Sequence, residues 1–159
     1  MLHVRVVGPA MARGLCATER VAAGDVLFAV TGITTAMPSR YSIQVGDAEH
    51  IDLSPGTPVD EMLVRHPWRF LNHSCSPNAA YRHRTFVALR PIESGESVTY
   101  DYDTTEFDMA EPFDCTCGSD ACRERVSGFA HLSPMAQEAL RPLLADHLRR
   151  RLDSALPLA

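Results

Sequence analysis

Three cysteines within eight residues constrain this chain more than any other feature of its sequence. Cys115, Cys117 and Cys122 follow the spacing C-x-C-x4-C, with a glycine inside the bend. Thiols this close together can share one metal ion, and a structural zinc requires four ligands. Of the two other cysteines, Cys75 lies in a polar stretch and Cys16 lies among small and apolar residues. We therefore predict a structural zinc bound by Cys75, Cys115, Cys117 and Cys122, and a packing role for Cys16.

Disulfide bonds are the alternative explanation for these cysteines. Five cysteines cannot all pair within one chain. The opening residues 1–5 alternate like a strand, and we expect no secretory leader before them. A reducing, intracellular compartment, cytoplasmic or nuclear, then favours zinc over disulfides.

The ten residues from Arg69 to Asn78 read R-F-L-N-H-S-C-S-P-N. Their Asn, His and Ser side chains compete with the backbone for hydrogen bonds, and Pro77 pushes Ser76 out of helical space. We therefore expect neither an ordinary strand nor a helix here. Polar groups beside apolar residues must find partners, and the simplest structure is a well-capped turn around a buried thiol.

Together these motifs resemble those of the SET-domain protein lysine methyltransferases that carry a post-SET zinc motif. Arg69–Asn78 resembles the family's R-F-I-N-H-S-C-x-P-N, and Gly95–Tyr102 resembles its G-E-E-L-T-x-D-Y. The cysteine cluster resembles the post-SET motif, whose fourth ligand is the cysteine of N-H-S-C. The resemblance covers about residues 3 to 131. It implies a mainly β, SET-domain (β-clip-like) fold of small sheets, with the 72–75 segment threaded by the Tyr102 segment into a pseudoknot.

The resemblance also implies an activity, which is methyl transfer from S-adenosylmethionine to the side-chain amine of a protein lysine. Tyr102 would be the catalytic tyrosine, Tyr100 would limit the number of methyl groups added, and Tyr41 would line the lysine channel. A tyrosine hydroxyl at Tyr100 leaves little space, so mono- or dimethylation is expected. From the residues alone, Tyr100 and Tyr102 sharing one strand face is also explained by packing. A half-buried strand tyrosine is the alternative explanation for Tyr41.

Contacts to the cofactor are implied at several places along the chain. Ala12–Leu15 takes the place of the family's G-x-G motif, with Ala12 replacing the first glycine; an ordinary turn is the alternative. The departure of Cys122-Arg123-Glu124 from the family's C-R-G puts the local turn in question, but not the metal. The implied cofactor-binding residues are Arg13, Gly14, Arg69, Phe70, Asn72, His73, Tyr102, Thr116 and Cys117.

Composition narrows the choice of partners. The chain has 159 residues, which suits one modest core, and a formal charge of −5. All fifteen basic residues are arginines. An acidic balance disfavours direct nucleic-acid binding and suits a basic, lysine-containing protein or peptide, such as a histone. No apolar run is long enough for a membrane span. The residues leave open a monomer or a homodimer.

Two other functions compete with methyl transfer. One is a catalytically degenerate SET module that binds the cofactor or a protein without turnover; Ala12 and Glu124 are its only support. The other is a small zinc-binding protein that recognises nucleic acid, which the acidic balance disfavours.

The pattern of apolar residues predicts strands at residues 4–7, 26–30, 41–45, 50–53, 85–89 and 97–102, with a helical turn at 60–66. Residues 104–113 are interpreted as a linker. Ser133 and Pro134 predict a helix start, and Pro142 predicts a kink or a split in that helix, which would pack on its own domain or on a second copy. The predicted divisions are a SET domain at 1–112, a post-SET zinc-binding segment at 113–131 and a C-terminal helical tail at 132–159.

Overall fold

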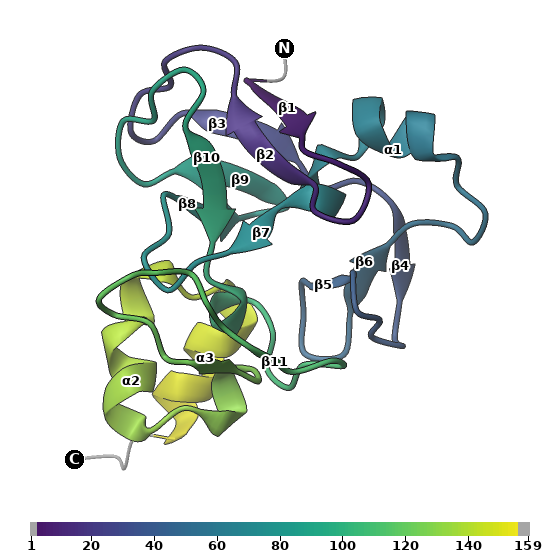
Figure 1. Cartoon of the computed structure of the whole chain (residues 1–159). Helices are drawn as coiled ribbons and strands as arrows, with labels where there is room; N and C mark the ends of the chain where they lie inside the picture. Colours follow the sequence, from purple (N-terminus) through teal and green to yellow (C-terminus); the bar gives the residue numbers. More distant parts are fainter. Residues whose placement is uncertain (1–2, 156–159) are drawn as a thin grey trace.

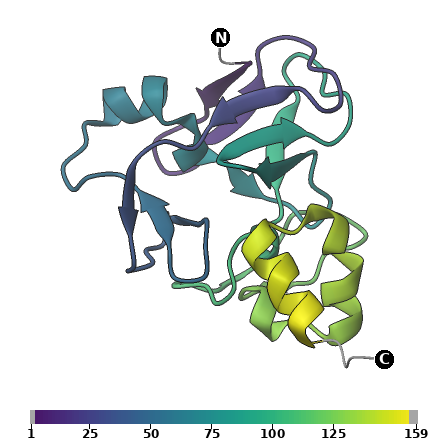
Figure 2. The ribbon, with the colours of Figure 1, turned by 180° about the vertical axis from the view of Figure 1, so that it is seen from behind.

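A computed structural model of the chain describes residues 3–155. Three small sheets and a two-stranded ribbon form most of the fold, and the C-terminal helices lie at the opposite end of the molecule from α1 (Figures 1 and 2). The largest sheet contains β1 (Val4–Val7), β2 (Gly14–Ala17), β10 (Ser97–Tyr100) and β7 (Asn72–His73), in that order. The second contains β3 (Val26–Ala29), β9 (Thr85–Ala88) and β8 (Ala79–Arg82), and the third contains β4 (Ile33–Thr35), β6 (His50–Asp52) and β5 (Ile43–Gln44). The ribbon pairs β11 (Phe113–Asp114) with β12 (Arg125–Val126).

Helices are few and short. The α-helices are α1 (Val59–Arg65), α2 (Pro134–Ala139) and α3 (Asp146–Ala155), and the 3-10 helices are η1 (Pro67–Phe70), η2 (Tyr102–Thr104), η3 (Phe129–His131) and η4 (Arg141–Leu143). None of the helices within residues 3–155 is long and apolar enough to cross a membrane. This mainly β architecture agrees with the predicted fold class.

One hydrophobic core joins the three sheets. Almost completely buried side chains from all three sheets belong to one cluster, among them Leu15 of β2, Leu27 of β3, Ile51 of β6, Phe86 of β9 and Val98 of β10. Burial of apolar surface from separate strands stabilises all three sheets together, although each has strands of only two to four residues.

The polar stretch around Asn72 is held by the main chain of β10. Asn72 and His73 pair in parallel with Thr99 and Tyr100, and η1 extends to Phe70. The expectation that residues 69–78 form neither strand nor helix is therefore wrong at both places. Asn78 extends the contact, since its side chain donates to the carbonyl of Ser97 and accepts from the amide of Thr99. The side chains that compete with regular structure therefore find their partners in another strand.

Several predicted strand limits also need correction. The predicted strand 97–102 ends at Tyr100, because the Asp101 carboxylate accepts the amide of Asp103 and begins η2. The strand predicted at 41–45 is reduced to Ile43–Gln44, and β2 begins at Gly14, inside the predicted loop Ala12–Leu15.

The C-terminal helices pack on their own domain. Ser133 caps α2 by accepting the amide of Ala136, and Pro142 separates α2 from α3, as predicted. Leu144, Leu148 and Leu152 pack against Phe129 and its neighbours. The amide of Ala145 donates to the carbonyl of Thr104, and a His147 ring nitrogen lies 2.8 Å from the carbonyl of Thr105. These contacts place the helices directly behind η2.

Candidate active site

The four predicted zinc ligands lie together. The sulfur atoms of Cys75, Cys115, Cys117 and Cys122 lie within 4.8 Å of one another, and those of Cys75 and Cys115 are 4.0 Å apart. In a tetrahedral site with Zn–S bonds of about 2.3 Å, sulfurs are about 3.8 Å apart, so the cluster fits a structural zinc. Four thiolates leave no open position on such an ion. Cys16 lies apart in β2, where its sulfur approaches the Ser97 hydroxyl, in agreement with its exclusion from the metal site.

Arg123 connects this cluster to the end of β10. Its amide donates to the sulfur of Cys75, and its Nη2 lies 2.5 Å from Asp101 Oδ1 and 2.8 Å from Asp103 Oδ2. Both carboxylates are buried. The next residue, Glu124, has a φ of +63°, the left-handed region that glycine favours, and its carbonyl accepts the amide of Cys115. Glu124 therefore adopts a turn conformation that a glycine would adopt without strain.

The three predicted channel tyrosines line one narrow cavity of about 50 Å³, together with Trp68 and Leu71. The rings of Tyr100 and Tyr102 have centroids 4.8 Å apart, although Tyr102 lies in η2 and not in the strand. The Tyr102 hydroxyl donates to the carbonyl of Leu71 at 2.8 Å. Burial raises the pKa of both Tyr100 and Tyr102 well above the usual range, so both phenols stay protonated at neutral pH.

Tyr41 lies at the mouth of this cavity, and its side chain is about half exposed. The Arg69 guanidinium lies over its ring, 4.0 Å from the centroid, and is held there by Asp52 Oδ1 at 3.1 Å. A cation over a tyrosine face is attracted by the ring's electrons and orients the ring.

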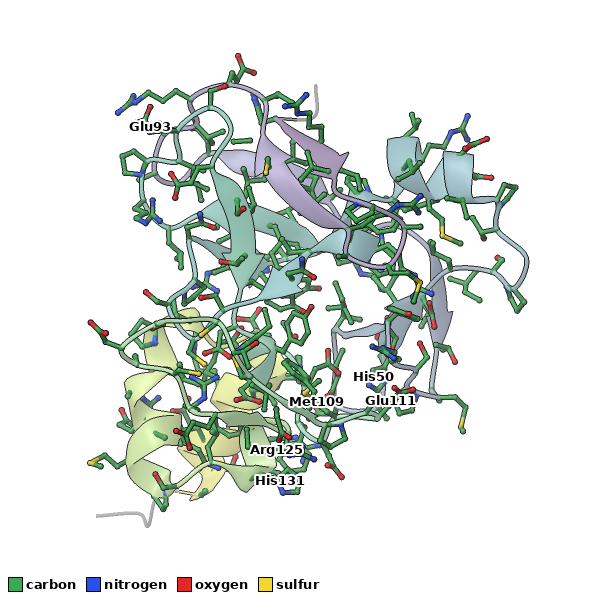
Figure 3. All side chains as sticks on the ribbon, viewed as in Figure 1. His50, Glu93, Met109, Glu111, Arg125 and His131 are labelled. Carbon is green, nitrogen blue, oxygen red and sulfur yellow. The ribbon has the colours of Figure 1, made fainter. Side chains whose placement is uncertain are left out.

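A larger groove of about 950 Å³ adjoins the narrow cavity. Both spaces are lined by Tyr41, Arg69, Leu71 and Tyr102, so the cavity and the groove meet at these side chains. Met109 and Glu111 also line both and come from the segment that precedes β11 (Figure 3). The predicted cofactor-binding residues that line the groove are Arg13, Arg69, Phe70, Asn72, His73, Tyr102, Thr116 and Cys117.

Gly14 stands behind the groove wall instead of lining it. A Cβ atom at this position would lie 2.9 Å from Asn72 Nδ2, and that nitrogen donates to the carbonyl of Arg13 at 3.1 Å. The glycine therefore admits the close approach of the Asn72 side chain. The Arg13 guanidinium lies over the Phe70 ring, 5.5 Å from its centroid, and closes this side of the groove.

His73 is oriented by two neighbours. Its Nδ1 accepts the amide of Tyr102 at 3.2 Å, which leaves the proton on Nε2, 3.2 Å from the sulfur of Cys75. Burial lowers the pKa of His73 to about 4, so the ring is neutral at physiological pH. The imidazole thus connects the cysteine cluster, through Cys75, to the backbone of Tyr102.

Sequence reasoning missed Glu106. The segment 104–113 is not simply a linker, because Thr104, Thr105 and Glu106 are buried and Glu106 lines the narrow cavity. Its Oε1 accepts the amide of Gln44 at 2.8 Å and the Thr105 hydroxyl at 3.2 Å. A run of polar residues without apolar periodicity is typical of an exposed segment, and only contacts from distant residues, Gln44 and Phe129 among them, reveal the burial.

Comparison with known proteins agrees with this geometry. The model of the SET domain family matches residues 12–103. Methyltransferase flvH of Aspergillus flavus is 32% identical over 126 residues, which cover 73% of this chain and 65% of that protein. Histone-lysine N-methyltransferase ash1 of Drosophila melanogaster is 33% identical over 97 residues, covering 55% of this chain and 4% of that protein. The chain thus spans just under two thirds of the first relative and a small part of the second.

Among solved structures, KRYPTONITE in complex with mCHH DNA, an H3(1-15) peptide and SAH matches with a TM-score of 0.55 at 23% identity, covering 79% of this chain and 29% of that chain. That likeness concerns the fold. The family model covers more than half of the chain and contains both the polar stretch at Asn72 and the tyrosines of β10 and η2. The chain therefore belongs to the SET domain family, and its cysteine cluster fits the zinc site of a post-SET segment.

Proposed function

We propose that this chain is an S-adenosylmethionine-dependent methyltransferase that acts on the side-chain amine of a protein lysine. The observation that carries the proposal is the meeting of a large groove and a narrow tyrosine-lined cavity at Tyr102. Methyl transfer by in-line displacement requires two reactants to approach from opposite sides and meet end to end. Two spaces of unequal width that join at one side chain suit a large cofactor on one side and a slender alkyl amine on the other.

The groove is the proposed cofactor site. S-adenosylmethionine supplies an electrophilic methyl group on a positively charged sulfur. The groove offers backbone groups, one amide side chain and an aromatic face, which suit the polar and apolar parts of S-adenosylmethionine. The residues that provide them are Arg13, Arg69, Phe70, Asn72 and His73. Thr116 and Cys117 form the opposite wall, and Gly14 keeps Asn72 in place from behind.

The narrow cavity is the proposed lysine channel. Tyr41, Tyr100 and Tyr102 would enclose the alkyl chain and exclude water, which disfavours the charged ammonium and lowers its pKa. The neutral Tyr102 hydroxyl is held by the Leu71 carbonyl and positions the amine without acting as a base. Tyr100 lies deeper in the cavity and would limit the product to mono- or dimethyl-lysine.

The zinc would be structural, since four thiolates complete its coordination. Cys117 is both a proposed ligand and a wall of the groove, so the metal would fix the wall over the cofactor.

The proposed substrate is a basic, lysine-containing protein or peptide. The formal charge of −5 favours a cationic partner and disfavours direct nucleic-acid contact. A related fold has been solved with an H3 peptide, and several relatives are named histone-lysine methyltransferases, so a histone tail at chromatin is the first substrate to test.

The test is transfer of radiolabelled methyl from S-adenosylmethionine to core histones and to whole-cell lysate, with Tyr102→Phe in parallel. We expect label on lysine, and a loss of at least about 100-fold in the variant, because the hydroxyl that orients the amine is gone. Calorimetry with S-adenosylhomocysteine should show that both proteins still bind the cofactor product. Cofactor binding by the wild type without transfer to any lysine would instead favour a degenerate SET module.

A further inference from the structure

Glu106 places a carboxylate inside the narrow cavity that Tyr41, Tyr100 and Tyr102 also line. The residue is only 7% exposed. Oε1 accepts the Gln44 amide and the Thr105 hydroxyl, while Gln44 Oε1 in turn accepts the amide of Phe107 at 2.8 Å. This reciprocal pair fixes the side chain between β5 and the end of η2. No hydrogen bond to Oε2 is found among residues 3–155.

These contacts do not require a negative charge. A glutamine has the same shape, and its oxygen would accept the same two hydrogen bonds. Within residues 3–155, no arginine or histidine lies at ion-pair distance from Glu106, and the chain contains no lysine. A buried carboxylate without a cationic partner is costly, which indicates that the charge serves something that enters the cavity.

Other ionisable groups face Glu106 from several elements. Those that line the same cavity are Arg40, Tyr41, Arg69, Tyr100, Tyr102 and Glu111, and Asp103 acts on it from η2. Burial raises the pKa of Glu106 to about 7, and the charge of Asp103 contributes in the same direction. The negative charge of Glu106 also helps to raise the pKa of Tyr100 and Tyr102, which indicates that it acts on both phenols.

We propose that Glu106 receives the ammonium group of the substrate lysine in this cavity and accepts its proton before methyl transfer. The inference rests on the proposed function and names the group that completes it. One N–H bond of the ammonium breaks, its electron pair remains on nitrogen, and an O–H bond forms at the carboxylate. Two opposite charges become two neutral groups, and the amine then has the free electron pair that the displacement requires. The proton leaves to solvent after turnover.

Burial makes this transfer feasible. In water the pKa of lysine, about 10.4, lies far above that of glutamate, about 4.3, so the carboxylate cannot hold the proton. An enclosed cavity disfavours both charged forms, which raises the pKa of the acid and lowers that of the ammonium. A channel of tyrosines alone would lower the pKa of lysine but would leave the proton without an acceptor.

The first test compares the kcat/KM of Glu106→Gln with that of the wild type between pH 6 and pH 10, using a peptide that the wild type methylates. We expect a loss of about 100-fold at pH 7, the usual size of acid–base contributions. The loss should shrink towards pH 10, where the substrate supplies free amine. Glu93→Gln neutralises an exposed carboxylate far from the cavity (Figure 3) and should match the wild type throughout. A wild-type rate and pH profile in Glu106→Gln would overturn the proposal.

A binding measurement decides the question without turnover. The probe is n-butylammonium, titrated by calorimetry into the protein saturated with S-adenosylhomocysteine. At pH 8 the wild type should bind it at least about tenfold more tightly than Glu106→Gln does. At pH 6 the two should agree to within about twofold, because Glu106 is then mostly protonated.

The wild type alone also tests the idea if the variant does not fold. Its affinity for n-butylammonium should fall as the pH drops through about 7, while the probe itself stays charged. A pH-independent affinity would overturn the assignment. If the wild type binds the probe in this way but methylates no lysine, the proposed function fails while the cation site in the cavity stands.

Discussion

Arg123 Nη2 lies 2.5 Å from Asp101 Oδ1, and this contact ties the segment of the cysteine cluster to the residue between Tyr100 and Tyr102. The same nitrogen also reaches Asp103, so one guanidinium pairs with two buried carboxylates. The segment that carries the cysteine cluster is thus anchored to the end of β10 by charge as well as by the contact with Cys75.

Replacing Arg123 with methionine should lower the free energy of unfolding by about 3–5 kcal/mol, because it leaves two buried carboxylates unpaired. Arg125→Met is the matched control, since the Arg125–Asp114 ion pair is exposed and worth at most about 1 kcal/mol. Urea unfolding of both variants in the presence of zinc measures the difference. Equal destabilisation of the two variants would show that the buried ion pairs of Arg123 contribute no more to stability than an exposed pair does.

Glu106 should make the stability fall as the pH rises. Its pKa is raised from 4.5 to about 7 in the folded protein, so between these values the folded state binds more protons than the unfolded state. Stability is therefore lost as the pH rises through this window, by about 3 kcal/mol at most, since one pKa unit corresponds to about 1.4 kcal/mol. Glu106→Gln should remove this slope and be the more stable protein at pH 8. Thermal unfolding at pH 5, 6, 7 and 8 measures the stability of both proteins. The same pH dependence in the wild type and in Glu106→Gln would contradict a buried charge at this residue.

Glu124→Gly should stabilise the protein by about 0.5–1 kcal/mol. The left-handed conformation costs a non-glycine residue about 1–2 kcal/mol, and the greater freedom of glycine in the unfolded chain returns part of the gain. Arg125→Gly, one residue later in β12, should instead destabilise, because a glycine within a strand loses entropy on folding without relieving strain. Differential scanning calorimetry compares the two, and a lower melting temperature for Glu124→Gly would refute the explanation.

Tyr100→Phe should increase the number of methyl groups added to each lysine. The phenol is buried beside Tyr102, and removal of its hydroxyl opens space for a methylated amine. Mass spectra of the peptide product should shift from mono- and dimethyl-lysine towards trimethyl-lysine. Tyr81→Phe, a buried tyrosine outside the cavity, should leave the product distribution unchanged. An unchanged product distribution in Tyr100→Phe would show that Tyr100 does not limit the number of methyl groups added.

Removal of zinc by a chelator should weaken the binding of S-adenosylhomocysteine at least about tenfold. The ribbon β11–β12 has only two residues in each strand, too few to be stable alone, so loss of the metal should also disorder the wall at Thr116 and Cys117. Metal analysis and calorimetry test this together. Cys75→Ser should lose zinc and affinity, whereas Cys16→Ser should retain both.

The metal cluster was predictable from sequence because its spacing alone brings three thiols together, and the polarity around Cys75 separates it from Cys16. The strands with apolar alternation, such as β9, were predictable for the same kind of local reason. The pairing of Asn72–His73 with β10 was not, since polar residues form a strand there only because a distant segment supplies the partners. Glu106 was missed because its burial depends on distant segments: its side chain accepts the amide of Gln44, and its carbonyl accepts the amide of Phe129.

The parallel contact between β7 and β10 also has a kinetic consequence. It joins residues 72–73 to residues 99–100, and β2 pairs with the other edge of the same strand. Closing such distant segments is slow, because chain entropy is lost before the contacts form. The candidate active site should therefore be assembled late in folding, and a local opening of this short ladder would abolish the proposed activity while the rest of the molecule remains folded.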